Sequence, residues 1–299
     1  MTNFISPPSL HDGDLVAILA PASAVDSQLV NGATQALERR GLRVKIFPSA
    51  FGRSGSYSGS IEARLADFRA ALADSDVKAI LCARGGYGCV HLLSGITPRP
   101  VWLIGFSDVS ALHALWLRAG IRSIHGSMAK ELALELCPGN DANKRLFEIM
   151  RSGSFAPLSW PASPLNRCGE ASGVIMGGNL AVLDGLVSTP YNIIGTQGSI
   201  LFIEDIAEPV YKVERMLYRL RLNGTFDRIA ALVVGQFTEY KPDPNGETME
   251  EMIARMVADY SFPVAFNAPI GHVDSNLPIL QGAQVTLTIT PKNTTLTPK

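Results

Sequence analysis

A serine stands at the point where an apolar run gives way to a helical pattern. Residues 101–106 read VWLIGF, and Ser107 follows them directly. A sharp turn from strand to helix would expose the Ser107 hydroxyl at a sheet edge and aim a helix N-terminus at it, as acyl-transfer nucleophiles require. Serine also caps helices routinely, and a helix is expected to begin near Val109. On these residues alone, both interpretations stay open.

The motifs around Ser107 limit the folds and reactions to which it can belong. Ser107 lies in GFSDV, which lacks the second glycine of G-x-S-x-G and disfavours an ordinary α/β-hydrolase fold. Residues 84–88 read RGGYG after another apolar run, and glycines there permit backbone N–H groups to point into a cleft. The N–H groups of Gly86 and Asp108 would make a reasonable oxyanion hole. Neither G-x-x-x-x-G-K-[ST] nor G-x-G-x-x-G occurs at this segment, so a phosphate or dinucleotide role is unsupported.

The chain has five histidines that can be weighed as the base for such a serine. His11 precedes the first expected strand, His91 follows the glycine-rich segment, and His113 points away from the N-terminus of its expected helix. His125 ends a probable strand and is expected to line the cleft. His272 lies in the loop PIGHVD, which has little core-forming pattern, so a functional role is favoured for it.

The matching acid is expected after residues 200–203, which read ILFI and end in Glu204 and Asp205. Two carboxylates after an apolar run place one of them at a strand terminus. Alone, they would be read as a solvated strand end. With a serine and a histidine also at element ends, a carboxylate that orients the imidazole becomes chemically coherent. The residues leave the choice between Glu204 and Asp205 open.

The first half of the chain alternates strand-like and helix-like segments. Strands are expected at residues 14–20, 43–47, 77–82 and 101–106, and helices at 27–40 and 61–73. This order predicts a parallel sheet flanked by helices, with ligands beyond the carboxyl ends of its strands. The Gly/Ser segment 51–60 is expected to be a mobile loop within this domain.

The predicted helices and strands of the second half are shorter than those of the first half, and more of them are strands. Residues 1–155 are expected to form an α/β domain that carries the nucleophile, and residues 173–299 a smaller, strand-rich α/β domain that carries the acid and the base. The Ser-, Pro- and Gly-rich residues 156–172 are expected to link them.

Composition excludes several classes of function. The net charge is −1, from 26 Lys plus Arg and 27 Asp plus Glu, which gives no support for binding nucleic acid or an anionic membrane. No segment approaches the length of about 20 apolar residues that spans a bilayer, and residues 1–14 lack signal-peptide features, so a cytoplasmic location is expected. The four irregularly spaced cysteines are expected to be buried free thiols, with no metal and no cofactor.

Several separated motifs resemble, in one order, the signature of the LD-carboxypeptidase family of serine peptidases. They are RGGYG at 84–88, GFSD at 105–108, HG at 125–126, LFIED at 201–205 with RML at 215–217, and GH at 271–272. The family includes proteins that confer immunity to microcin C. The resemblance implies Ser107 as nucleophile, Glu204 as orienting acid and His272 as base, with oxyanion N–H groups from Gly86 and Asp108. Ser127 departs from the proline common after His-Gly in relatives.

The resemblance also implies an activity and an assembly. It implies a homodimer without metal that removes a terminal D-alanine from muropeptides recycled in the cytosol, and an N-terminal sheet of flavodoxin-like or glutamine-amidotransferase-like type. A carboxypeptidase must bind a free α-carboxylate, for which Arg84 and then Lys130 are candidates. Arg84 in an internal ion pair is the alternative. Two rival functions remain: a microcin-immunity-like hydrolase of peptide–nucleotide conjugates, and a non-catalytic peptide-binding protein.

Overall fold

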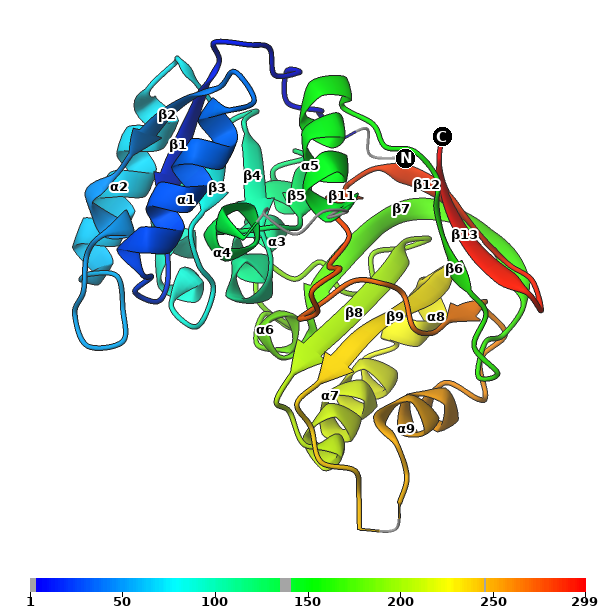
Figure 1. Cartoon of the computed structure of the whole chain (residues 1–299). Helices are drawn as coiled ribbons and strands as arrows, with labels where there is room; N and C mark the ends of the chain where they lie inside the picture. The colour runs from blue at the N-terminus through cyan, green and yellow to red at the C-terminus, as the bar shows by residue number, and fades with distance from the viewer. Residues whose placement is uncertain (1–3, 135–140, 245) are drawn as a thin grey trace. The chain divides into compact units, whose positions relative to one another are not determined.

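The computed structural model describes residues 4–134, 141–244 and 246–299. The chain forms two compact units (Figure 1). The first comprises Met1–Phe155 with Leu277–Leu280, and the second comprises Ala156–Asn276 with Gln281–Lys299. Each unit contains one β-sheet and its own helices, which confirms the α/β class expected from the sequence.

The first sheet has six strands in the order β11-β5-β4-β3-β1-β2. Their bounds are β1 Leu15–Leu19, β2 Arg43–Ile46, β3 Val77–Cys82, β4 Trp102–Gly105, β5 Ser123–His125 and β11 Ile279–Gln281. The pairs from β2 to β5 are parallel. The order 2-1-3-4-5 is that of flavodoxin-like sheets, in which ligands bind at the carboxyl ends of the strands near β1 and β3.

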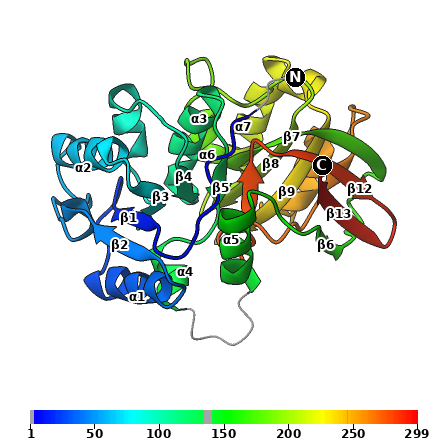
Figure 2. The same ribbon diagram turned by 90° about the horizontal axis from the view of Figure 1, so that it is seen from above.

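Helices cover both faces of this sheet. They are α1 Ser27–Glu38, α2 Ile61–Ala73, α3 Ser110–Arg118, α4 Ala129–Ala133 and α5 Asp141–Ser152, with short 3₁₀ turns η1 Pro48–Ala50, η2 Cys89–Gly95 and η3 Ser107–Val109. Figure 2 shows α1 and α4 together on one face and α2 and α3 on the other. Asp26 and Ser60 are the N-caps of α1 and α2, because each side chain accepts a hydrogen bond from a first-turn N–H.

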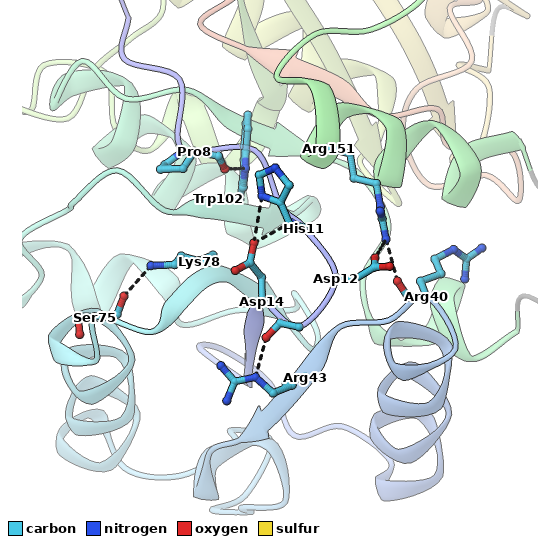
Figure 3. A network of polar contacts seen from close by, with 11 residues as sticks. Pro8, His11, Asp12, Asp14, Arg40, Arg43, Ser75, Lys78, Trp102 and Arg151 are labelled. Carbon is cyan, nitrogen blue, oxygen red and sulfur yellow. Dashed lines mark hydrogen bonds and ion pairs between the residues drawn. The ribbon is translucent and has the colours of Figure 1, made fainter.

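A polar network ties the N-terminal segment to the amino ends of the first sheet (Figure 3). Trp102 Nε1 donates to the carbonyl of Pro8 at 2.9 Å. Arg151 Nη2, from α5, donates to Asp12 Oδ1 at 2.7 Å and to the carbonyl of Arg40 at 2.8 Å. These bonds lie at the amino ends of the strands, whereas the loops that follow β1, β3 and β4 lie at the carboxyl ends. The network therefore stabilises the fold and takes no part in the candidate active site.

The second sheet has seven strands in the order β10-β9-β8-β7-β12-β13-β6. Their bounds are β6 Leu158–Pro161, β7 Gly169–Asn179, β8 Ile200–Ile206, β9 Ala231–Thr238, β10 Val264–Ala265, β12 Gln284–Ile289 and β13 Asn293–Pro298. Strands β7 to β10 pair in parallel, and β12, β13 and β6 continue the sheet in antiparallel pairs. Its helices are α6 Leu180–Asp184, α7 Val210–Leu222, α8 Thr225–Arg228 and α9 Met249–Met256.

The segment expected as a linker, residues 156–172, takes part in the second sheet. It contains β6, which pairs with β13, and the start of β7. Trp160 Nε1 donates to the carbonyl of Phe266 at 3.0 Å, and Arg167 Nη2 donates to the carbonyl of Val257 at 2.9 Å. Proline and serine suggested a loop here, but the alternate residues Leu158 and Trp160 are buried and supply an edge strand.

Three cysteines can be placed, and their thiols are free. Cys82 and Cys89 are buried, as expected, whereas Cys168 is exposed. Cys137 lies outside the described residues. Across the described ranges, no helix combines the length and the apolar character needed to cross a bilayer.

Candidate active site

Ser107 occupies a strained turn between β4 and α3. Its φ is 63°, a left-handed value that non-glycine residues rarely adopt, while Phe106 before it is extended at φ −149°. Such a conformation costs on the order of 1–3 kcal/mol and persists only where its surroundings impose it. Ser107 caps neither η3 nor α3, whose cap residues are Phe106 and Val109. A strand, a strained serine and a helix in this order are also the backbone arrangement of a nucleophile elbow.

A buried histidine holds the backbone just before this turn. His113 Nε2 lies 2.8 Å from the Gly105 carbonyl, and its Nδ1 lies 2.8 Å from Ser123 Oγ. Because a carbonyl only accepts, Nε2 carries the proton and Nδ1 accepts from the Ser123 hydroxyl. Burial lowers the pKa of His113 to about 4, although the bond to Gly105 opposes this, so the ring is neutral near pH 7. His113 therefore serves the turn and is unsuited to be the base.

The glycine-rich loop lies directly against the serine. A Cβ at Gly85 would stand 2.9 Å from Ser107 Cβ and 3.2 Å from the Asp108 nitrogen, so only glycine permits this approach. Gly86 has φ 104°, and a Cβ there would stand 2.1 Å from Ser23 Oγ. Ser23 N donates to the Gly85 carbonyl at 3.2 Å. The loops after β1, β3 and β4 thus meet at one sheet edge, as the strand order predicts.

The two basic candidates for substrate binding lie on different elements of the first unit. Arg84 opens the glycine-rich loop, is exposed, and donates from Nη1 to the carbonyl of Ala24 at 2.9 Å. Arg84 thus bonds to a backbone carbonyl, whereas the alternative interpretation expected an internal ion pair. Lys130 is exposed on α4.

In the second unit, an imidazole and a carboxylate form a buried pair. His272 Nδ1 lies 2.9 Å from Glu204 Oε2, with side-chain exposures of 15% for the histidine and 0% for the glutamate. Glu204 is on β8, and His272 follows Gly271, which bridges to Gln236 of β9. A carboxylate that accepts from Nδ1–H leaves Nε2 as the nitrogen that can take up a proton.

Two glycines make room for this carboxylate. A Cβ at Gly235 would stand 3.2 Å from Glu204 Cβ, and one at Gly271 would stand 3.2 Å from Glu204 Oε2. The pairing of β8 with β9 shifts register at this level, after Ile203. The buried Asn276 then fixes the histidine loop, because its Oδ1 accepts from Gly271 N at 2.9 Å. The sequence alone did not indicate this role of Asn276, because a single asparagine in a loop belongs to no recognisable motif.

Asp205 performs a different task from its neighbour. Its carboxylate accepts 2.8 Å hydrogen bonds from Asn179 Nδ2 and from Ala181 N, at the start of α6. Burial raises the pKa of Asp205 to about 6, and these N–H donors act in the opposite direction. Of the two carboxylates left open by the sequence, Glu204 is the one bonded to His272.

His125 and His91 contact other side chains of the first unit, whereas the side chain of His11 is 82% exposed and lies beside Asp14. His125 is buried at the end of β5, with its ring centroid 5.9 Å from that of Phe106 and 6.3 Å from that of His113. His91 Nδ1 lies 3.2 Å from Arg64 Nη2. In the described parts of the chain, no group of three or more His, Cys, Asp or Glu residues is arranged to hold a metal ion.

Comparison with known families matches both halves of the chain. Residues 16–126 match the LD-carboxypeptidase N-terminal domain, and residues 172–287 match the LD-carboxypeptidase C-terminal domain. The chain belongs to the LD-carboxypeptidase family. This confirms the resemblance drawn from the separated motifs.

Individual members of the LD-carboxypeptidase family align over most of their length. A probable murein peptide carboxypeptidase of Bacillus subtilis is 32% identical, with 94% of this chain and 91% of the relative covered. The murein tetrapeptide carboxypeptidase of Pseudomonas aeruginosa is 31% identical, with 87% and 89% covered. The crystal structure of muramoyltetrapeptide carboxypeptidase from Oxalobacter formigenes superposes with a TM-score of 0.83 at 28% identity, covering 95% of this chain and 98% of that one.

The fold is also that of a microcin-related protein. The structure of MccF in complex with glutamyl sulfamoyl guanosine superposes with a TM-score of 0.86, covering 99% of both chains at 19% identity. At that identity the likeness concerns the fold alone.

Proposed function

We propose that this protein is a serine LD-carboxypeptidase that removes a C-terminal D-alanine from muropeptides recycled in the cytosol. The observation that carries the serine assignment is the 2.9 Å bond from His272 Nδ1 to the fully buried Glu204. This pair supports the assignment because, in a hydrolytic triad, the carboxylate fixes the tautomer of the histidine and stabilises the imidazolium. Membership of the LD-carboxypeptidase family supports a peptide bond as the bond that is cleaved.

In the proposed mechanism, Ser107 Oγ attacks the carbonyl carbon of the bond that precedes D-alanine, and His272 Nε2 takes up the hydroxyl proton. The N–H groups of Gly86 and Asp108 stabilise the oxyanion. Collapse of the tetrahedral intermediate breaks the C–N bond, and the imidazolium returns its proton to the departing amine. Water, deprotonated by His272, then hydrolyses the acyl-enzyme and restores the Ser107 hydroxyl.

Recognition of the terminal carboxylate is assigned to Arg84, with Lys130 as the second candidate. One N–H of Arg84 is used by the Ala24 carbonyl, and a guanidinium carries five N–H donors, so others remain for a carboxylate. The proposal includes a homodimer and a metal-free reaction, both carried over from the family likeness.

The proposed function is tested with matched peptides. A peptide ending in L-Lys or meso-diaminopimelate followed by D-alanine is the expected substrate. Its L-alanine counterpart is expected to resist cleavage, because inverting the stereocentre moves the carboxylate away from its donors. Amidation of the terminal carboxylate should lower kcat/KM by a large factor. Equal rates on all three peptides would refute the carboxypeptidase assignment while leaving a hydrolase in place.

Hydrolysis of a peptide–nucleotide conjugate is the second candidate, because the fold is shared with MccF. A tryptophan or another aromatic side chain placed to stack on a nucleobase would favour it. Trp102 and Trp116 are fully buried, and Trp160 is 4% exposed. The first candidate is preferred, because relatives named as murein peptide carboxypeptidases are 31–32% identical to the chain, whereas MccF is 19% identical. Turnover of a glutamyl sulfamoyl nucleoside in place of the muropeptide would reverse the preference. A non-catalytic peptide-binding protein would turn over neither.

A further inference from the structure

One peptide unit at the end of the glycine-rich loop is held from both sides. The Gly88 carbonyl accepts a 3.0 Å hydrogen bond from Arg64 Nη1. The N–H of the same peptide, on Cys89, donates to Asp108 Oδ2 at 2.8 Å. Arg64 is 1% exposed and Asp108 is 3% exposed, so both charged groups lie in the interior. A buried charge needs partners, and each finds one in this peptide.

Arg64 also binds the two loops beside the glycine-rich loop. Its Nη1 donates to the carbonyl of Pro21, after β1, at 2.6 Å, and its Nε donates to the carbonyl of Gly59, before α2, at 3.2 Å. Its guanidinium carbon lies 5.3 Å from the centroid of the Tyr57 ring. A rigid planar fork with five donors can satisfy several carbonyls at once, whereas a lysine cannot reproduce that geometry.

The loop is shaped to admit this arginine. Gly88 has φ 135°, and a Cβ there would stand 2.8 Å from Arg64 Nη1 and 3.4 Å from the Cα of Ala22. Any side chain at position 88 would displace the guanidinium or the loop. The glycines of this loop therefore permit two close contacts, one between Gly85 and Ser107 and one between Gly88 and Arg64.

Asp108 joins the loop to the nucleophile turn. It follows Ser107 directly, and its own backbone N–H is one of the two proposed oxyanion donors. Burial raises the pKa of its carboxyl, while the bond from Cys89 N–H and the nearby Arg64 guanidinium act in the opposite direction. Its side chain holds Cys89, which is three residues from Gly86, the other proposed donor.

We propose that Arg64 and the Asp108 carboxylate are positioning residues that set the spacing of the two oxyanion N–H groups by clamping the Gly88–Cys89 peptide between them. The inference rests on the proposed roles of Ser107, Gly86 and Asp108. Loss of one oxyanion donor costs about 10²- to 10³-fold in kcat, and a misplacement of about 1 Å costs about 10²-fold. Releasing the clamp should therefore lower kcat by roughly 10²-fold.

The test compares variants that release one side of the clamp. Arg64→Met and Asp108→Ala should each lower kcat by roughly 10²-fold and leave KM within about threefold, because the ground state does not use the oxyanion donors. The double variant should be hardly worse than either single one, since both act on the same peptide. Asp108→Asn keeps an acceptor oxygen for Cys89 N–H and should retain most of the activity.

A matched control lies on the same helix. Arg69 is exposed, and its Nε donates to the carbonyl of Gly95, at the far end of η2, at 2.7 Å. Arg69→Met removes an arginine–carbonyl bond of the same kind and should keep kcat near the wild-type value. Arg64→Ala vacates the space of the side chain, and ethylguanidinium at millimolar concentration should restore activity to that variant and have no effect on the control.

A peptide boronic acid, which forms a tetrahedral adduct on serine, gives the deciding readout. Its affinity should fall roughly 10²-fold in Arg64→Met, with product affinity unchanged; a purely structural role would weaken both. Wild-type kcat in folded Arg64→Met or Asp108→Ala, or losses that multiply in the double variant, would overturn the clamp. If Arg64→Met fails to fold, Arg64→Lys must show the same kcat loss. A wild-type protein that neither binds the boronic acid nor reacts with a fluorophosphonate at Ser107 would refute the proposed function instead.

Discussion

Replacing His113 by glutamine tests how the turn at Ser107 is held. It also tests how much folding free energy the buried imidazole loses at acidic pH. The neutral imidazole donates to the Gly105 carbonyl and accepts from Ser123, both at 2.8 Å. Glutamine offers one donor and one acceptor at a similar reach and cannot take up a proton in this pH range. The substitution should therefore preserve most of the contacts and abolish the titration.

The expected magnitude follows from the pKa of His113, which burial lowers from 6.5 to about 4. At about 1.4 kcal/mol per pKa unit, the complete effect is about 3 kcal/mol. The unfolded chain takes up the proton near pH 6.5 and the folded protein only near pH 4, so the native state is fully favoured above pH 6.5 and loses stability as the pH falls through this window. Between pH 7.5 and pH 5, the loss from His113 should be about 2 kcal/mol.

The assay is urea unfolding followed by tryptophan fluorescence in a Trp160→Phe background. The remaining tryptophans, Trp102 and Trp116, are fully buried in the first unit and report on its unfolding. Other groups also titrate, and the raised pKa of Asp205 acts in the opposite direction, since its protonated form is favoured on folding. The quantity compared is therefore the difference between the parent and His113→Gln at each pH, in which those groups cancel.

The parent should lose about 2 kcal/mol more than the variant between pH 7.5 and pH 5. Equal losses in the two proteins would refute a neutral, buried His113. A variant that unfolds at pH 7.5 would show that glutamine cannot replace the two hydrogen bonds, and His113→Asn then provides the same comparison with a shorter amide.

The remaining predictions concern the catalytic groups and their supports. Ser107→Ala and His272→Ala should each lower kcat by roughly 10⁶-fold, with a double variant hardly worse and Glu204→Gln less impaired; a Ser107→Ala variant with more than about a tenth of the activity would remove the nucleophile assignment. Activity should survive prolonged treatment with EDTA, and inhibition reversed by zinc would contradict the serine mechanism. Asn276→Ala leaves the Gly271 N–H without its acceptor and should cost about 1–3 kcal/mol of stability, measured by denaturant unfolding, together with a fall in kcat from a looser His272 loop; unchanged stability would show that this bond is dispensable.

The sequence by itself determined the parts of the first unit that depend on local pattern. Short apolar runs predicted β1, β3 and β4 to within a residue or two, because buried parallel strands are apolar throughout. A serine after β4 and glycines after β3 were then placed at the carboxyl edge by strand order alone. A sharp turn at Ser107 was predicted from the abrupt change from strand to helix, with serine as a cap an equal interpretation, whereas its left-handed φ came from the structure.

Pairings between distant segments were decided only by the tertiary structure. Strands β6 and β11 are 4 and 3 residues long, too short for a periodic signal, and each forms only through a partner far away in the chain. Glu204 and Asp205 could not be told apart from their types, because neighbours on a strand point to opposite faces and the faces are set by what packs there. His272 binds one and the start of α6 binds the other.

The polar supports of the first unit were also beyond the sequence. His113 was set aside as a base from its helical position, but its bond to Gly105 spans 8 residues and its bond to Ser123 spans 10. Arg64 lies within the helix predicted at residues 61–73 and carried no signal of its own, yet it donates to carbonyls 43 and 24 residues away. Local patterns follow from backbone periodicity and burial, whereas a buried polar side chain acquires its role from the partners that folding brings within 3 Å or so of it.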